Sequence, residues 1–170
     1  MKAMILAAGL GTRLRPLSDI KPKALIPVAN RPVLDRNVEY LTRHGVTEIV
    51  VNIHHHPEQM LSFLGSGSFQ ARIETRVEPE ILGTGGGIRN TADFWDREPF
   101  VVMNGDILTD IDLTRAYEQH QKTRPLATLI LHDHEPFNKI RIDGAGRITD
   151  IPHTYDLEGL AFTGIHILEP

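Results

Sequence analysis

Hydrophobic positions follow two different periods along this chain. Several short runs are fully apolar or β-branched, as expected of buried strands, and one run alternates polar and apolar residues. Between them, apolar residues recur at helical spacing. Strands are predicted at residues 3–8, 47–53, 71–77, 100–103 and 126–132, and helices at residues 31–45, 57–64, 87–94 and 113–121. This alternation predicts an α/β fold with a doubly wound, mainly parallel sheet and helices on both faces.

Individual residues indicate where the first helix begins and how the last part of the chain folds. Arg31-Pro32 is predicted to open the first helix, because proline suits a first helical turn. After His134 the pattern changes: residues 139–142 and 147–151 flank a glycine-rich turn, which indicates a β-hairpin. Residues 160–168 form one more predicted strand. We therefore expect an α/β unit followed by a small β-rich appendage.

Composition excludes several classes of protein. A chain of 170 residues with 41% hydrophobic and 24% charged residues fits one folded domain, and no apolar run approaches the roughly 20 residues that span a bilayer. The chain has no cysteine, hence no disulfide or thiolate metal site. Its net charge of -4 argues against a nucleic-acid binder. The apolar stretch at residues 3–8 is too short for a signal peptide, so we expect a cytoplasmic protein that is not bound to a membrane.

A glycine-rich loop follows the first predicted strand. It reads Gly9-Leu10-Gly11-Thr12-Arg13-Leu14-Arg15-Pro16. Backbone N–H groups of such a loop can approach a phosphate chain, and arginine binds phosphate through two hydrogen bonds. The loop matches neither the dinucleotide fingerprint, which needs a third glycine in place of Leu14, nor the Gly-Lys-Ser/Thr phosphate loop. A lone Gly-x-Gly would equally suit a surface turn.

Further along, the chain continues with Lys21-Pro22-Lys23-Ala24-Leu25-Ile26-Pro27-Val28. With the preceding loop, this run resembles the signature of the sugar-1-phosphate nucleotidyltransferases, also called nucleoside-diphosphate-sugar pyrophosphorylases. The resemblance covers almost all of the chain and implies a Rossmann-like nucleotidyltransferase fold. Within this family, the chain most resembles N-acetylmuramate 1-phosphate uridylyltransferases, with heptose and mannose 1-phosphate guanylyltransferases as near alternatives.

The resemblance implies which groups bind the phosphates and the metal. Arg13 and Lys23 match the cations that neutralise the nucleotide, and Asp106 of Asn104-Gly105-Asp106 matches the aspartate that binds Mg²⁺. These are the three expected catalytic residues. The physical chemistry agrees, since attack on a tetra-anionic nucleotide needs cations to lower the repulsion and to stabilise departing pyrophosphate. Asp110 and Asp112 are interpreted as helix-capping acids.

A nucleotide cleft is implied by the same resemblance. Its expected lining is Ala8, Gly9, Gly11, Thr12, Arg13, Lys23, Glu78, Gly83, Thr84 and Gly85. The glycines of residues 83–87, which we expect to form a loop ahead of a helix, would let backbone approach the base. Glu78 lies where relatives read the base. A carboxylate could accept from uracil or thymine N3–H, or from guanine N1–H and its amino group, whereas it could also be an ordinary loop charge.

Sugar-binding residues are expected towards the end of the chain. The resemblance implies Asn104, Asn138, Gly144, Thr163 and Gly164. Many relatives carry Glu-Lys-Pro after the hairpin, where this chain has residues 151–153 of different character, so the sugar stays open.

The run of three histidines at residues 54–56 could suggest a metal site. Consecutive residues of extended chain point to opposite faces, so the three side chains cannot converge easily on one ion. We interpret this run as a solvated strand end, and no Gly-x-Ser-x-Gly motif indicates a serine hydrolase.

The expected activity is transfer of a nucleotidyl group from a nucleoside triphosphate, UTP or GTP, to a sugar 1-phosphate. The resemblance further implies a single domain, with a nucleotide-binding half at residues 1–134 and the start of a sugar-binding half at residues 135–170. Relatives need a second aspartate beyond the last predicted strand, so we expect a C-terminally truncated chain. The alternative is a nucleotide-binding module, or a fragment, without turnover of its own. The oligomeric state is left open.

Overall fold

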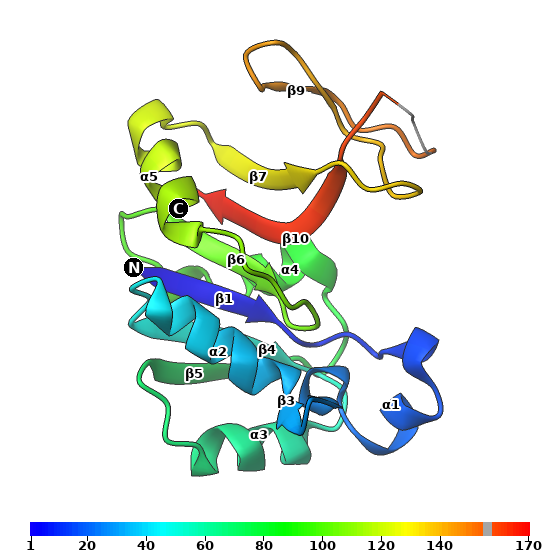
Figure 1. The fold of residues 1–170 in the computed structure, drawn as a ribbon. Helices are drawn as coiled ribbons and strands as arrows, with labels where there is room; N and C mark the ends of the chain where they lie inside the picture. The colour runs from blue at the N-terminus through cyan, green and yellow to red at the C-terminus, as the bar shows by residue number, and fades with distance from the viewer. Residues whose placement is uncertain (155–157) are drawn as a thin grey trace.

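A six-stranded sheet forms the centre of the molecule (Figure 1). The computed structural model describes residues 1–154 and 158–170. In sheet order the strands are β5 (Arg72–Val77), β4 (Glu48–Ile53), β1 (Lys2–Leu6), β6 (Phe100–Asn104), β10 (Ala161–Leu168) and β7 (Ala127–His132). Strands β5, β4, β1 and β6 run parallel, and their carboxyl ends point to the side where the short helix α1 (Leu17–Ile20) lies. The predicted parallel α/β architecture is confirmed.

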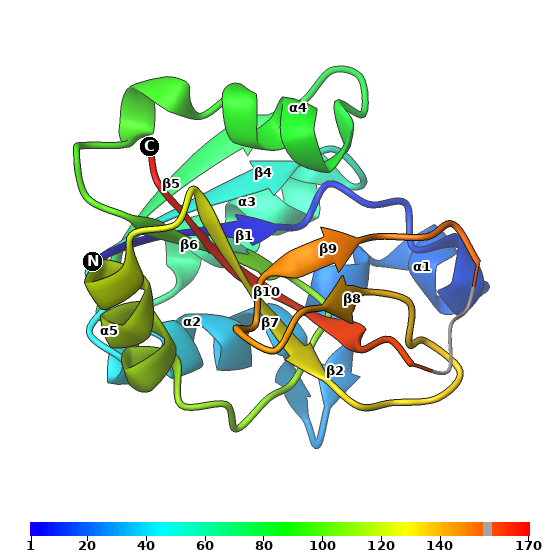
Figure 2. The ribbon, with the colours of Figure 1, turned by 90° about the horizontal axis from the view of Figure 1, so that it is seen from above.

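Helices cover both faces of the sheet (Figure 2). One face carries α2 (Val33–Arg43), α3 (Pro57–Ser66) and α5 (Leu113–Thr123), and the other carries α4 (Gly83–Arg89) with a short 3-10 turn at Ala92–Phe94. Successive residues of one strand serve the two faces, as strand geometry requires. On β1, Ile5 packs with α2 and α3, whereas Met4 packs with Phe94. Within the described ranges, no helix has the length and apolar character needed to cross a membrane.

Strand β10 corrects the expected appendage. The sequence placed residues 160–168 with the β-rich end of the chain, but β10 inserts into the main sheet, antiparallel to both β6 and β7. Its fully buried Ile165 and Ile167 pack in the main core, and neither could be covered by a small hairpin. The appendage is therefore only the predicted hairpin, β8 (Arg141–Ile142) and β9 (Ile148–Asp150), which lies outside the main sheet at its β7 end (Figure 1).

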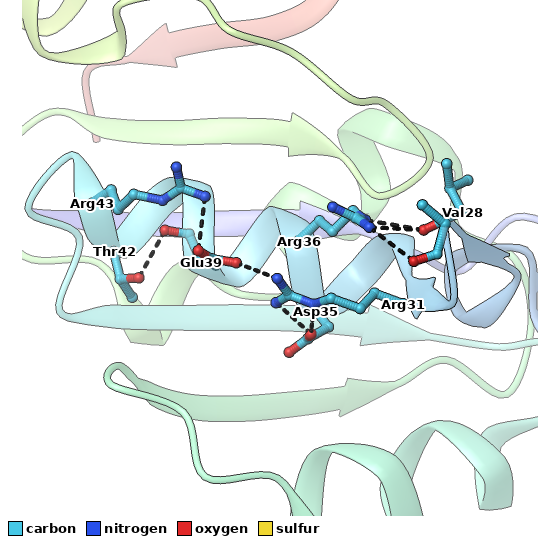
Figure 3. Close-up of polar contacts among 8 residues, drawn as sticks. Val28, Arg31, Asp35, Arg36, Glu39, Thr42 and Arg43 are labelled. Atoms are coloured by element: carbon cyan, nitrogen blue, oxygen red, sulfur yellow. Dashed lines mark hydrogen bonds and ion pairs between the residues drawn. The ribbon is translucent and has the colours of Figure 1, made fainter.

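The start of the first long helix also differs from the prediction. Arg31–Pro32 forms β3, which pairs with β2 (Pro27–Val28) in a small hairpin, and α2 begins only at Val33. The turn residues Ala29 and Asn30 have φ of 47° and 62°, as a tight hairpin turn requires. Arg36 of α2 donates hydrogen bonds to the carbonyl oxygens of Val28, at 2.9 Å, and Ala29, at 3.3 Å (Figure 3).

Salt bridges along α2 continue this surface network (Figure 3). Arg31 binds Asp35 at 2.6 Å and Glu39 at 2.7 Å, and Arg43 binds Glu39 at 2.9 Å. The hydrogen bond from Arg31 is the main cause that lowers the pKa of Glu39. The hairpin is thus fastened to the first turns of α2, which explains why Arg31 and Pro32 are not helical.

Ala29→Gly is expected to stabilise the protein. A non-glycine residue in the left-handed region costs about 1–2 kcal/mol, partly offset by the greater backbone entropy of glycine in the unfolded chain. Because exposed Ala29 has φ of 47°, the free energy of unfolding should rise by about 0.5–1 kcal/mol, measured by urea denaturation. Ala145→Gly, in an exposed turn of ordinary φ, is the control and should not stabilise. Equal effects of the two changes would contradict the argument.

Candidate active site

A cleft of about 400 Å³ opens at the carboxyl ends of β1, β4 and β6. Open α/β sheets place their ligands at this edge, and the volume suits a small-molecule ligand. The lining residues come from five separate segments of the chain. They are Leu6, Ala7, Ala8, Gly9, Gly11, Thr12, Arg13, Lys23, Ala24, Asn52, Glu78, Ile81, Gly83, Thr84, Asn104, Gly105 and Asp106. Eleven of these had been named from the sequence as site residues.

The glycine-rich loop after β1 folds back over the cleft. Gly11 has φ of 66°, and a Cβ there would lie 3.1 Å from the Cβ atoms of both Ser18 and Lys23. Only glycine combines this backbone conformation with so close an approach. The loop thereby brings Arg13 and Lys23 to one cleft although ten positions separate them. Arg15, in contrast, pairs with Asp19 at 3.1 Å and does not line the cleft.

Lys23 and Asp106 form an ion pair across the cleft. Asp106 follows β6, and Gly105 ahead of it donates its N–H to the carbonyl oxygen of Leu6 at 2.9 Å. A Cβ at Gly105 would lie 2.9 Å from that same oxygen, so glycine lets the ends of β1 and β6 approach. Both charged side chains keep solvent access, with 25% of Lys23 and 31% of Asp106 exposed. They are therefore accessible to a ligand that enters the cleft.

The segment after Asp106 is anchored at its far end. Asp112 caps α5 by accepting a hydrogen bond from the N–H of Arg115 at 3.0 Å, as expected, whereas Asp110 is not the cap. The hydroxyl of Tyr40 on α2 donates to the carbonyl oxygen of Ile111 at 2.7 Å. Burial, together with the charges of Asp112 and Asp110, raises the pKa of Tyr40 to about 12, so this donor stays protonated. The loop that carries Asp106 is thus held between α2 and α5.

A buried hydrogen-bonded network under the cleft was not foreseen. Asn52 accepts the N–H of Ala7 at 2.8 Å and donates to Oε1 of Glu78 at 2.8 Å. Oε2 of Glu78 accepts the N–H of Leu82 at 3.1 Å. Asn52 and Glu78 are only 3% and 1% exposed, so Glu78 is not an ordinary loop charge. The signal for Asn52 was a polar residue within an apolar strand, which requires a partner when buried.

The glycine triplet lies inside a helix rather than in a loop. Helix α4 contains Gly83 and Gly85–87 and ends at Arg89, which corrects the expected helix at residues 87–94. Gly87 is buried, and a Cβ there would lie 2.9 Å from Nδ2 of Asn52 and 3.1 Å from Oε1 of Glu78. Gly87 thus lets this helix pack directly on the network. Gly83 and Thr84 line the cleft, whereas Gly85 is not among its lining residues.

The residues expected to bind the sugar separate into two groups. Asn104 lines the cleft, and Gly164 packs against it, since a Cβ at Gly164 would lie 2.9 Å from Nδ2 of Asn104. Thr163 donates its hydroxyl to the carbonyl oxygen of Ile130 at 2.8 Å. Asn138 is buried, accepts the N–H of His134 at 2.8 Å and pairs with Asp133, so its side chain serves a turn.

The position of Gly144 also contradicts its predicted role in sugar binding. It lies in the exposed turn of the β8–β9 hairpin, where a Cβ would meet nothing within 4 Å, and it does not line the cleft.

The histidine run is a structural feature and not a solvated strand end. His54 and His55 are half-buried, and each hydrogen bonds a carbonyl oxygen, of Glu78 at 2.8 Å and of Ser18 at 2.7 Å. In the part of the chain that the structure describes, no three histidine or acidic side chains come together as a metal-binding group. Asp106 is the carboxylate that the cleft offers at its open side.

The chain belongs to the nucleotidyl transferase family, whose sequence model matches residues 2–170. It is 37% identical to N-acetylmuramate alpha-1-phosphate uridylyltransferase of Neisseria meningitidis serogroup B, over 100% of this chain and 76% of that protein. It is 39% identical to UTP--glucose-1-phosphate uridylyltransferase of Synechocystis sp., over 76% of this chain but only 37% of that protein. The crystal structure of HddC from Yersinia pseudotuberculosis, complexed with GMP-PN, matches with a TM-score of 0.84 and 26% identity, over 99% of this chain and 76% of that one. The chain thus spans between about a third and three quarters of these relatives.

Proposed function

We propose that this chain transfers a nucleotidyl group from UTP or GTP to a sugar 1-phosphate, which yields a nucleoside diphosphate sugar and pyrophosphate. The meeting of Arg13, Lys23 and Asp106 in one cleft at the carboxyl edge of the sheet carries the proposal. The Neisseria relative is named for uridylyl transfer, and HddC was crystallised with a guanine nucleotide analogue, which supports both bases.

In the proposed reaction, a phosphate oxygen of the sugar 1-phosphate attacks the α-phosphorus of the triphosphate. The bond between the α-phosphorus and the bridging oxygen to the β-phosphate breaks, and pyrophosphate leaves with that electron pair. Arg13 and Lys23 bind the phosphates and lower the repulsion between the two anionic substrates. The backbone N–H groups around Gly9 and Gly11 face the same chain of phosphates in this arrangement. No covalent enzyme intermediate is required.

A magnesium ion is part of this proposal, and the donor set of the cleft fits it. Mg²⁺ is usually held by one or two carboxylates together with waters and phosphate oxygens, and Asp106 supplies a partly exposed carboxylate. When bound there, the ion would neutralise charge on the phosphates. Lys23 pairs with Asp106, so its ammonium group lies close to any ion or phosphate that Asp106 would bind.

We assign one substrate to each side of the cleft. Gly83 and Thr84 of α4, with Glu78 beneath them, form the side that we assign to the base. Asn104, with Gly164 packed against it, forms the side that we assign to the sugar phosphate. We also propose that the protein works in the cytoplasm, where nucleoside triphosphates are available, and that its product serves as a sugar donor for cell-wall or other polysaccharides.

Release of pyrophosphate tests this function. The chain should be incubated with UTP, GTP, dTTP or CTP, each with N-acetylmuramate, mannose or glucose 1-phosphate, and with Mg²⁺. We expect turnover with UTP or GTP, and the same nucleotide should raise the apparent melting temperature most, with CTP raising it least. Nucleotide binding without turnover would favour the binding-module alternative, and absence of both would contradict the proposal.

Glu78→Gln separates base recognition from a purely internal role. Both carboxylate oxygens already accept hydrogen bonds, and the amide would direct a donor at Asn52 or at the N–H of Leu82. One lost hydrogen bond corresponds to about a two- to tenfold weaker affinity. We expect this loss to be similar for UTP and GTP, measured by titration calorimetry. Glu80→Gln, on an exposed neighbour, is the control, and a loss confined to GTP would instead show that Glu78 reads the base.

A further inference from the structure

The histidine run and the first turn of α3 lie beside the loop that carries Arg13 and Lys23. Two side chains of this segment donate to carbonyl oxygens of α1, which lies between those two cations in the sequence. Nε2 of His55 is 2.7 Å from the carbonyl oxygen of Ser18, and Nε2 of Gln59 is 3.0 Å from that of Ile20. Since a carbonyl only accepts, His55 must carry its proton on Nε2.

These two carbonyl groups cannot be satisfied within α1. The helix has only four residues, Leu17–Ile20. The residue four positions after Ser18 is Pro22, which has no N–H to donate. After Ile20 the chain turns extended, with φ of -149° at Lys21, so the helix does not continue to meet the carbonyl of Ile20 either. The partners supplied by His55 and Gln59 replace the missing helical hydrogen bonds.

The held helix lies directly beneath the phosphate loop. Ser18 is 1% exposed, and its Cβ would lie 3.1 Å from a Cβ on Gly11. A Cβ on Gly11 would also lie 3.1 Å from the Cβ of Lys23. Gly11, Ser18 and Lys23 are therefore packed as one unit, and whatever fixes Ser18 also fixes the backbone that presents Arg13 and Lys23.

We propose that His55, assisted by Gln59, is a positioning residue that holds the phosphate-binding loop in its nucleotide-binding conformation. His55 is not among the residues that line the cleft, and it acts through the carbonyl group of Ser18. The adjacent His54 makes the equivalent contact on the other side, to the carbonyl oxygen of Glu78 at 2.8 Å. One short segment after β4 thus fastens both walls of the cleft. The expected effect on nucleotide affinity rests on the proposed function, whereas the expected effect on the mobility of the loop does not.

The structural consequence is tested first, in ligand-free protein, by hydrogen exchange. In His55→Ala, backbone amides of residues 9–23 should exchange faster than in the wild type, whereas those of β4 should be unchanged. Gln59→Ala removes an exposed side chain and should give the same local change with less effect on folding. His55→Gln should restore protection, because its amide nitrogen can donate where Nε2 of histidine does.

The kinetic consequence is tested by substrate-specific constants. Loss of one positioning hydrogen bond should raise the Kd and KM for the triphosphate about three- to tenfold in His55→Ala, with the KM for the sugar 1-phosphate unchanged. The control is Glu58→Gln, which changes an exposed side chain in the same first turn of α3. A purely structural role would lower stability without this split between substrates.

The outcomes separate the two proposals. Wild-type exchange in both the His55→Ala and Gln59→Ala variants would overturn the positioning role, as would an unchanged Kd for the triphosphate. A wild-type chain that binds no triphosphate would overturn the proposed function, while the exchange data would still decide whether His55 holds the loop.

Discussion

Asp106→Asn is expected to lower kcat by about 10²–10³-fold, because a metal ion contributes several kcal/mol of charge stabilisation to a phosphoryl-type transition state. Asparagine keeps the size of the side chain but removes the charge that would hold Mg²⁺ and that pairs with Lys23. Both side chains are partly exposed, so the lost ion pair should change the free energy of unfolding by less than about 1 kcal/mol. Pyrophosphate release and urea denaturation on the same preparation measure the two quantities.

Asp110→Asn is the matched control for this change. Asp110 lies on the same loop, is exposed and does not line the cleft, so turnover should stay within about twofold of the wild type. Equal loss in both variants would mean that the loop, and not the carboxylate of Asp106, is responsible. Full activity of Asp106→Asn at saturating Mg²⁺ would contradict the proposed catalytic role of Asp106.

Asn52→Ala is expected to cost about 3 kcal/mol of stability, because it leaves a buried carboxylate oxygen and a half-buried N–H group without partners. The N–H of Ala7 and Oε1 of Glu78 both hydrogen bond Asn52 at 2.8 Å. Ala7 follows the end of β1, and Glu78 lies under the side of the cleft that we assign to the base. Nucleotide affinity should therefore fall as well. Urea denaturation measures the loss in stability.

Asn90→Ala serves as its control. Asn90 is an exposed asparagine next to α4, and its replacement should change the free energy of unfolding by less than about 0.5 kcal/mol. A loss in Asn52→Ala no larger than this would show that water or another group replaces both hydrogen bonds.

Most of the fold could be predicted from local patterns. On each central strand, alternate residues face the two layers of helices, so an apolar run with no polar face indicates a strand covered on both sides. The position of strand β10 in the sheet could not be predicted in this way. Its apolar pattern identified it as a strand, but whether Ile165 and Ile167 complete the main sheet or an appendage depends on pairing with β6 and β7, and pairing is not local.

The start of α2 and the glycine run of α4 were also predicted wrongly from the sequence. Arg31 and Pro32 satisfy the preferences of a first helical turn, yet their pairing with Pro27 and Val28 prevails. The glycines of α4 have poor helix propensity and suggested a loop. The close contact of Gly87 with Asn52 and Glu78 explains why glycine stands at position 87 of that helix.

From the sequence alone, local patterns determined the class of fold, because strands and glycine-rich turns have local signatures. The resemblance to the nucleotidyltransferases implied which groups, Arg13, Lys23 and Asp106, meet at the carboxyl edge of the sheet. Only the tertiary structure decided how these groups are held. The ion pair of Lys23 with Asp106, the buried network of Asn52 and Glu78, and the contact of His55 with Ser18 all join residues distant in sequence. Such partners are chosen by burial, since each polar group that loses water must find whichever donor or acceptor the packed chain brings near it.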